Sequence, residues 1–582
     1  MAVRRGVWIV LVLIILAVAV SAAGLIGMAV LVGRDPQVSS NSTLVLKVAG
    51  DLADVEAGGV LSPFIESTPT VRSIVDALRK AKVDRRISSV IIRPTSAAAL
   101  WGKVQEVRDA IVDFRKSGKP IIGYLEYGGQ QEFYLASACD KVFLMPSASL
   151  DLTGISSYEL FLRGTLDKIG AYPDSLHIGD YKTYSNTFSE HSYTPAHREM
   201  AESLNSDLYG QLIRGLADGR HKSEKEIRDL VDHGPFLPED AVRAGLVDDL
   251  AYEDELDDKV RLGKVPANLL DDDDYRHVSL ASLGLNKGPR IAVIYAAGVI
   301  ASGKSSYDSP SGQVVGSDTM AEYLRKARAD ASIKAIVLRI DSPGGSAIAS
   351  DVIWREVMLT RDVKPVIASM SDVAASGGYY IAMPAHAIVA EPATLTGSIG
   401  VVMLKFVIDG TLKKLGVNME GVGNGRYADL YSPVRAFSPD ERAKMMEQMQ
   451  ATYDTFVEKA AAGRNTTPER IDSVGQGRVW TGKQGKQIGL VDELGGLDRA
   501  LVIAKQRAKL APDSEVELVV YPGKKSIYDI VKNPFGASDR AATALGTLLG
   551  IGDPRAIQAI TAPLRVFRRG EPLAIMPNVF IR

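Results

Sequence analysis

Residues 78–93 read LRKAKVDRRISSVIIR and residues 324–339 read LRKARADASIKAIVLR, so one pattern occurs twice at an offset of 246. In each copy a basic stretch with helical periodicity is followed by a short apolar run that is rich in β-branched residues. This change from a helical to a strand-like pattern is typical of a βα unit. The pair of segments therefore predicts a mixed α/β fold in which one unit is present twice.

Further matching segments follow in the same order and at nearly the same offset. They are KPIIGYLEY (from 119) with KPVIASMSD (from 364), FYLASACDKVFLMP (133) with YYIAMPAHAIVAEP (379), LTG (152 and 395), and GDYKTYS (179) with GRYADLYS (425). Several matching blocks in one order are hard to obtain by chance, and such self-similarity marks a duplicated unit. We therefore expect tandem copies of one βα domain.

An uncharged apolar run near the start of the chain predicts a membrane anchor. It covers residues 6–33 and follows Arg4 and Arg5. The run is longer than the roughly 20 residues that a spanning helix needs, and longer than the apolar part of most cleaved signal peptides. The basic pair before it predicts a cytoplasmic N-terminus and an extracytoplasmic remainder. Residues 7–33 would contact the lipid bilayer.

The repeat and the composition together divide the chain into five predicted parts. These are a cytoplasmic tip with the transmembrane anchor (1–40), a first repeat (41–265), an acidic linker (266–288), a second repeat (289–520) and a C-terminal tail (521–582). The tail is rich in glycine, proline and small residues, and we expect it to have little core of its own.

The composition argues against several classes of function. The formal net charge of the 582 residues is -2, so no overall basic field points to a nucleic-acid partner. Cys139 is the single cysteine, which rules out a disulfide framework within one chain. None of the seven histidines stands in a metal-ligand spacing such as HExxH. We expect neither a metal nor a cofactor.

Two glycine-rich segments of the second repeat carry candidate catalytic groups. RIDSPGGSA (339–347) lies between an apolar strand and a helical pattern, which leaves backbone N–H groups free to bind an oxyanion. In SDVAASGGYYIAMPA (371–385), small neighbours surround Ser376, and Gly377 could offer a second N–H group. Taken singly, the first segment also fits a plain strand-to-helix turn and the second fits close helix packing.

Together, the motifs DSPGGS, ASGGYYIA and LTGSIGV resemble those of the signal peptide peptidase A family, in its long two-domain form. These are serine proteases of the Clp-protease/crotonase fold. The resemblance covers essentially the whole chain. It implies Ser376 as the nucleophile and the N–H groups of Gly345 and Gly377 as the oxyanion hole, with Gly344 as a secondary candidate. It also implies Lys182, in GDYKTYSNTFSE, as the general base.

The internal alignment agrees with a site that is split between the repeats. The second repeat has Ala428 where the first has Lys182, and the first has Gln131 where the second has Ser376. A free lysine has a pKa near 10.4, but burial lowers that pKa and leaves an amine that can accept a proton. The sequence does not decide whether the two halves meet within one chain or between neighbours.

Histidines are the rival bases, because His191 lies nine residues after Lys182 and His386 lies ten after Ser376. Surface or structural roles are the ordinary expectation for both.

The resemblance implies a single-pass protein of the bacterial inner membrane with its catalytic part outside the cytoplasm. It implies a homotetrameric serine endopeptidase that degrades apolar peptides, such as remnant signal peptides and unfolded segments. One alternative is a non-catalytic membrane scaffold. The other is a crotonase-type enzyme of acyl-thioesters, which an extracytoplasmic location disfavours because coenzyme A is cytosolic.

Overall fold

The computed structural model describes residues 16, 38–50, 52–55, 69–97, 99–256, 259, 268–306, 313–523, 571–577 and 580–581. The predicted anchor over residues 7–33 lies outside these ranges except for Leu16. Within the described ranges, no helix is both long and apolar enough to cross a membrane.

The first repeat is built on a parallel sheet with the order β7-β4-β3-β2-β1-β8. Its central strands are buried and rich in Val, Ile and Leu, as a parallel sheet with helices packed on it requires. The strands are β1 (Ser42–Gly50), β2 (Ile87–Ala97), β3 (Ile121–Leu125), β4 (Lys141–Leu144), β7 (Asp249–Leu250) and β8 (Asn268–Asp271). The packed helices include α2 (Val71–Val83), α3 (Trp101–Arg115) and α4 (Gln130–Ala136).

The second repeat forms a sheet of the same plan, with the order β18-β16-β14-β12-β9-β20 and β15 beside β14. Its strands are β9 (Arg290–Ala297), β12 (Ile333–Ser342), β14 (Val366–Ala375), β15 (Ala387–Ala390), β16 (Leu395–Gly397), β18 (Val479–Thr481), β19 (Glu493–Leu494) and β20 (Glu517–Tyr521). The helices that pack near it include α12 (Ser317–Ala329), α13 (Ala347–Arg361), α14 (Gly377–Ala382) and α19 (Leu497–Arg507).

The offset seen in the sequence recurs in the structure. Helices α2 and α12 begin at Val71 and Ser317, and α3 and α13 begin at Trp101 and Ala347, so both pairs are 246 residues apart. The acidic stretch that we expected to be a linker is structured where it is described. It supplies β8 and the short helix α11 (Asp272–Arg276) to the first repeat.

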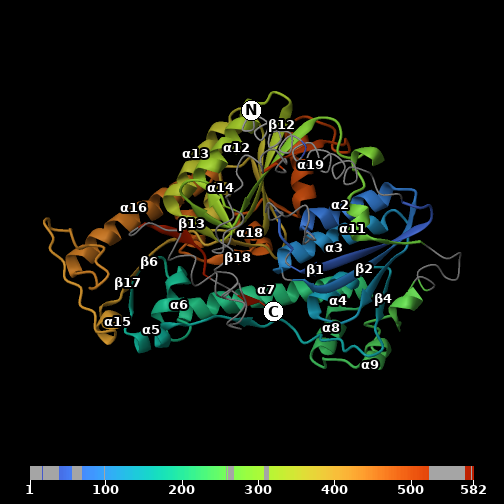
Figure 1. Ribbon diagram of the computed structural model, residues 1–582, viewed down its shortest axis with the longest axis horizontal. Coiled ribbons are helices and arrows are strands. Elements are labelled where there is room, and N and C mark those ends of the chain that lie inside the picture. Colours follow the sequence, from blue (N-terminus) through green and yellow to red (C-terminus); the bar gives the residue numbers. More distant parts are fainter. Residues whose placement is uncertain are drawn as a thin grey trace, which may run out of the picture.

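A third sheet joins segments that are far apart in the sequence (Figure 1). Its order is β11-β10-β13-β21-β17-β6, with β6 from the first repeat and β21 from the predicted tail. Strand β6 pairs antiparallel with β17 along its whole length, from Tyr172 opposite Val407 to Ile178 opposite Val401. The strands are β6 (Tyr172–Ile178), β10 (Val299–Ala301), β11 (Val314–Gly316), β13 (Gly344–Ser346), β17 (Val401–Val407) and β21 (Leu573–Ile575).

The long helix α7 (Pro195–Arg220) runs across the lower middle of Figure 1, from below the second repeat into the first. Met200 and Leu204 pack against Val373 and Ala375 of the second repeat, while later residues of the helix join the core of the first. The remaining elements are β5 (Ser157–Tyr158), α5 (Arg163–Ile169), η1 (Thr183–Ser185), α6 (Asn186–Ser189), α8 (Glu224–Val231), α9 (Pro238–Arg243), η2 (Glu253–Glu255), η3 (Ala281–Leu283), α15 (Asp409–Lys414), α16 (Pro439–Gly463), α17 (Pro468–Val474), α18 (Gly482–Ile488) and β22 (Phe580–Ile581).

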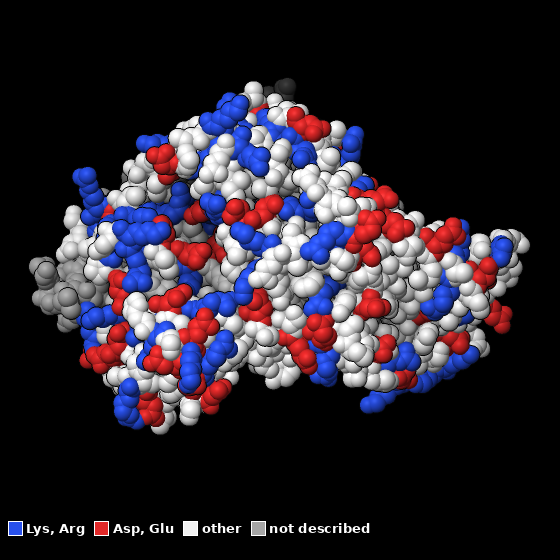
Figure 2. All heavy atoms as spheres, turned by 180° about the vertical axis from the view of Figure 1, so that it is seen from behind, with Lys and Arg blue, Asp and Glu red and all other residues white. Residues whose placement is uncertain are grey.

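Charged side chains of both signs are interspersed over the surface in Figure 2. On the face drawn, the described residues form no broad basic patch for a polyanion, in agreement with the formal net charge of -2.

Candidate active site

Ser376 lies in the sharp turn between β14 and α14. Its backbone has φ 54° and ψ -112°, a conformation that a residue with a side chain rarely adopts and that surrounding contacts must maintain. Its N–H donates to the Gly397 carbonyl at 2.7 Å, and every residue of β14 before it is buried. The strand and the turn therefore fix the position of a fully buried hydroxyl.

Lys182 approaches this hydroxyl from the first repeat. It stands in the short loop between β6 and η1, and its Nζ lies 2.7 Å from Ser376 Oγ. Because β6 is a strand of the third sheet, the loop after it reaches the second repeat. The structure thus brings the two predicted residues together within a single chain.

The surroundings of Lys182 favour a neutral amine. The side chain is fully buried, and burial places its pKa well below 10.5. Its Nζ also lies 2.9 Å from the Ser398 carbonyl oxygen and 3.0 Å from Ser398 Oγ. A carbonyl and two hydroxyls orient the amine without adding a carboxylate that would keep it charged.

Ser398 is a contact that we did not predict. It follows β16 within the LTGSIGV motif, so the motif itself was the available signal. Its φ of 50° turns the chain so that both its carbonyl and its hydroxyl reach Lys182.

The lysine loop rests on a glycine of the second repeat. Gly477 has φ +82°, and a Cβ added there would lie 2.4 Å from the Lys182 nitrogen. The neighbouring Tyr181 N–H donates to the Gln476 carbonyl at 2.9 Å. Only glycine combines this backbone conformation with so close an approach.

Two of the glycines predicted for the oxyanion hole, Gly344 and Gly377, lie close to each other beside Ser376. Gly377 is the first residue of α14, where N–H groups have no partner within the helix. Gly344 has φ +100°, and a Cβ added there would lie 2.6 Å from the Gly377 nitrogen. Gly345 is the middle residue of β13. Gly344 and Gly377 therefore lie together at the turn that carries the candidate nucleophile, and Gly345 follows Gly344 in β13.

Strand β21 occupies the space beside these glycines. It pairs antiparallel with β13, with Ala574 opposite Gly345, and it also touches β17. The Ala574 carbonyl oxygen would lie 2.0 Å from a Cβ at Gly344 and 3.1 Å from one at Gly377. A carbonyl of an extended segment therefore points toward the predicted oxyanion hole.

The two histidines considered as rival bases have other contacts. The ring of His191 is mostly exposed and lies 3.7 Å from Asp167, whereas His386 Nδ1 accepts a hydrogen bond from the Val366 N–H at 3.1 Å. Within the part of the chain that the structure describes, no group of three or more His, Cys, Asp or Glu side chains could hold a metal ion.

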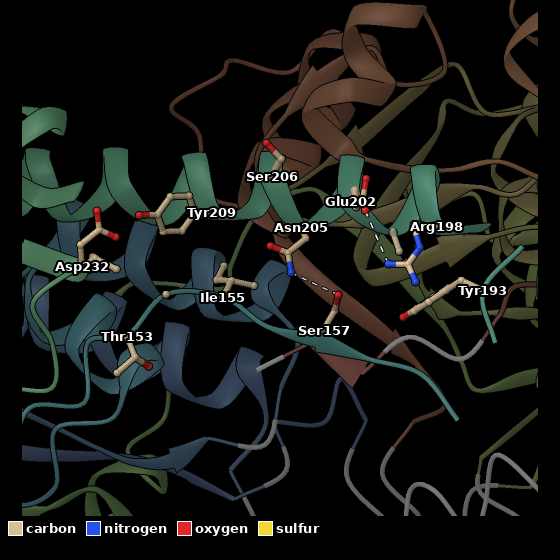
Figure 3. Close-up of a pocket in the computed structure, with 13 residues that line it drawn as sticks. Thr153, Ile155, Ser157, Tyr193, Arg198, Glu202, Asn205, Ser206, Tyr209 and Asp232 are labelled. Atoms are coloured by element: carbon tan, nitrogen blue, oxygen red, sulfur yellow. Dashed lines mark hydrogen bonds and ion pairs between the residues drawn. The ribbon is translucent and has the colours of Figure 1, made fainter. Parts of the chain in front are cut away.

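A separate open cavity of about 610 Å³ lies between α7 and the loop over residues 153–157 (Figure 3). Arg198 pairs with Glu202 at 3.9 Å across one turn of α7, and Asn205 donates to Ser157 Oγ at 3.3 Å. All of its lining residues belong to the first repeat, so this cavity is not the Ser376 site.

Comparisons with known proteins identify related proteases. The model of "Peptidase family S49" matches residues 113–264 and 359–511, one segment in each repeat. "Serine protease SPPA, chloroplastic" of Arabidopsis thaliana is 38% identical over 490 residues, which are 83% of this chain and 72% of that protein.

Two bacterial relatives are similar over comparable lengths. "Protease 4" of Salmonella typhi is 34% identical and covers 84% of this chain and 78% of its own length. "Protease 4" of Haemophilus influenzae is 32% identical, with 76% and 74% covered. The resemblance to the signal peptide peptidase A family is thereby confirmed, and the chain belongs to peptidase family S49 as a serine peptidase.

Proposed function

We propose that the chain hydrolyses peptides with a Ser–Lys dyad formed by Ser376 and Lys182. The observation that carries the proposal is the 2.7 Å contact between Ser376 Oγ and Lys182 Nζ, both fully buried. A serine hydroxyl is a weak nucleophile until a base removes its proton, and a neutral lysine within hydrogen-bond reach can do so. Lowering of the Lys182 pKa by burial supports that role.

In the proposed reaction, Ser376 Oγ attacks the peptide carbonyl carbon while its proton passes to Lys182 Nζ. The N–H groups of Gly345 and Gly377 hold the oxyanion, with Gly344 close by. Collapse of the tetrahedral intermediate breaks the C–N bond, and the lysine returns the proton to the leaving amine. Water then attacks the acyl-enzyme with the same lysine as base, which releases the acid and restores both residues.

The proposed substrates are extended apolar peptides, including remnant signal peptides. Strand β21 supports this choice, since its sequence Leu-Ala-Ile lies extended between β13 and β17 with all three residues buried. A substrate would pair in the same way, by addition of a strand to a sheet. We also propose the division of the chain into the five parts named above, with boundaries at residues 40, 265, 288 and 520, where β8 and α11 of the stretch 266–288 extend the first repeat.

The proposed setting is the bacterial inner membrane, with residues 7–33 as a single anchor and the catalytic part outside the cytoplasm. The length and the flanking charges of that apolar run support this placement. We also propose that four copies of the chain assemble into a homotetramer.

Hydrolysis of an apolar fluorogenic peptide by detergent-purified protein tests this function. Unaltered protein is compared with Ser376→Ala and Lys182→Ala, and the oligomer size of each is measured by light scattering. We expect both variants to lose cleavage at unchanged size. Full activity of Lys182→Ala would move the base to another residue, and absence of cleavage by the unaltered protein would favour the scaffold alternative.

A further inference from the structure

The start of helix α3 in the first repeat forms hydrogen bonds with β14, the strand that leads to Ser376. Asp372 precedes Ser376 by four residues on β14, and its carboxylate accepts two backbone N–H groups from the first repeat. Leu100 N–H donates to Oδ2 at 2.9 Å, and Lys103 N–H donates to Oδ1 at 2.7 Å. A carboxylate at a helix start satisfies N–H groups that have no partner within the helix.

The side chain of Lys103 joins this strand to the neighbouring one. Its Nζ donates to Asp341 Oδ2 at 2.6 Å and lies 3.8 Å from Asp372 Oδ2 and 3.7 Å from Asp54 Oδ2. Asp341 is near the end of β12, three residues before Gly344, and its Oδ1 accepts the Val373 N–H at 3.2 Å. One buried lysine of the first repeat therefore holds the ends of both strands that lead into the site.

Lys103 remains charged in this position. Burial alone would lower its pKa, but the neighbouring carboxylates Asp341, Asp372 and Asp54 raise it above the ordinary value. Arg339 of the second repeat forms another link between the repeats. Its guanidinium donates to two carboxylates of the first repeat, Asp54 at 2.9 Å and Glu106 at 2.6 Å.

The duplication explains why this contact can form. At the offset of 246, α3 corresponds to α13 and Leu100 corresponds to Ser346, the residue directly after Gly345. In the second repeat this helix start follows the glycines of the predicted oxyanion hole. In the first repeat those glycines are absent, and the same helix start holds the Asp372 carboxylate. The fit is close, because a Cβ added to Gly102 would lie 3.0 Å from the Ser371 carbonyl oxygen.

We propose that Lys103 and Asp372 are positioning residues for the reaction, and that the degenerate site of the first repeat aligns the working site of the second. Neither residue touches the reacting atoms. Lys103 and the start of α3 hold the ends of β12 and β14 in register, which sets Ser376 against Gly344, Gly345 and Gly377. This role rests on the proposed function, since it concerns the geometry of the same dyad.

Steady-state kinetics of Lys103→Met and Asp372→Asn on an apolar fluorogenic peptide test the proposal. We expect kcat to fall by about 10- to 100-fold in each, because misplacement by about 1 Å far from the chemistry can cost that much. We expect KM to stay within about twofold, because the surfaces that would contact the peptide are unchanged.

Loss of stability must be separated from loss of alignment, because Lys103→Met leaves Asp341 and Asp372 without their cation and Asp54 with Arg339 alone. The double variant Lys103→Met/Asp341→Asn removes the cation together with its nearest carboxylate. We expect its Tm to return toward that of the unaltered protein while kcat stays low. Lys80→Met is the matched control. It removes another buried lysine of the first repeat, whose Nζ donates to the Tyr275 and Val278 carbonyls away from the site. It should lower Tm and leave kcat unchanged.

Recovery of kcat together with Tm in the double variant would overturn the proposal, and so would an unchanged kcat in folded Asp372→Asn. Both results require that the unaltered protein cleaves the peptide and that Ser376→Ala does not. Failure of that condition would instead contradict the proposed function, so the two failures are distinguishable.

Discussion

At the scale of single residues, the proposed chemistry depends on Lys182, whose amine has no carboxylate partner among the described residues of the site. Lys103 and Lys182 are both buried lysines in the same chain, and their surroundings shift their pKa values in opposite directions. Carboxylates raise the pKa of Lys103, whereas burial among hydroxyls and a carbonyl lowers the pKa of Lys182. The first therefore serves as a fixed cation, and the second can serve as a base.

This difference predicts the pH dependence of peptide cleavage. The base acts in its neutral form, so kcat/KM should rise with pH through the pKa of Lys182 and level off above it. Because burial holds that pKa well below 10.5, we expect the midpoint of the rise below pH 10.5, with activity retained toward neutral pH. A pH profile of kcat/KM checks this, and Lys182→Arg, which cannot become neutral, should be inactive throughout. A profile that rises only above pH 10.5 would contradict it.

Ser398→Ala tests how the amine is oriented. The change removes the hydroxyl 3.0 Å from Lys182 Nζ but keeps the carbonyl at 2.9 Å. One net hydrogen bond is worth about 0.5–1.5 kcal/mol, so kcat should fall by roughly 2- to 10-fold. Ser223→Ala is the control, because it removes the N-cap of the remote helix α8 and should lower Tm alone. An unchanged kcat in Ser398→Ala would show that the carbonyl suffices.

At the scale of secondary-structure elements, the position of Lys182 depends on the loop after β6. This loop packs against residues 476–478 of the second repeat. Gly477→Ala adds a Cβ only 2.4 Å from the Lys182 nitrogen, so the loop must move. We expect kcat to fall by at least about tenfold, since a displaced base loses its contact with Ser376 Oγ.

Gly416→Ala is the matched control for that variant. Gly416 has a similar φ of +73°, yet nothing lies within 4 Å of a Cβ added there. Both variants strain the backbone by about 1–2 kcal/mol, and only Gly477→Ala displaces the lysine. Peptide cleavage and Tm are measured for both. Equal kcat values in the two variants would contradict the claim that Gly477 positions the Lys182 loop.

The position of strand β21 leads to a second prediction at the scale of secondary-structure elements. It lies on the edge of β13 with the Ala574 carbonyl at the predicted oxyanion hole, so it competes with a peptide for the same edge. A chain that ends at residue 570 should therefore show a higher kcat/KM for a short apolar peptide. A chain that ends at residue 577 keeps the strand and is the control. An unchanged or lower value in the shorter chain would contradict the prediction.

For the whole molecule, the sequence predicts the duplication and the candidate site better than it predicts how the repeats fit together. The offset of 246 and the alternation of helical and strand-like patterns predict two α/β units, because both are read directly from the order of residues. The motifs and the family resemblance name Ser376 and Lys182. Burial of the lysine is visible only in the structure.

The parts that the sequence does not reveal are long-range pairings. Strand β6 joins β17 more than 200 residues away, and β21 joins β13, although no local periodicity indicates either partner. The same limit applies to Lys103, which looks like an ordinary surface lysine at a helix start until the second repeat covers it. Such contacts depend on how the whole chain folds back on itself.

The most direct test of the account asks whether one chain supplies a complete site. Ser376→Ala and Lys182→Ala chains with different tags are co-expressed, and mixed assemblies are purified through both tags. Assemblies of Ser376→Ala with the unaltered chain serve as the active control.

The structure places Lys182 Nζ 2.7 Å from Ser376 Oγ within one chain, so each chain in the mixed assembly lacks one member of its own dyad. We therefore predict that the mixture of the two variants cleaves no more peptide than either variant alone, while the control mixture is active. Cleavage restored in the mixture of the two variants would show that neighbouring chains complete each other's sites, and would contradict the account.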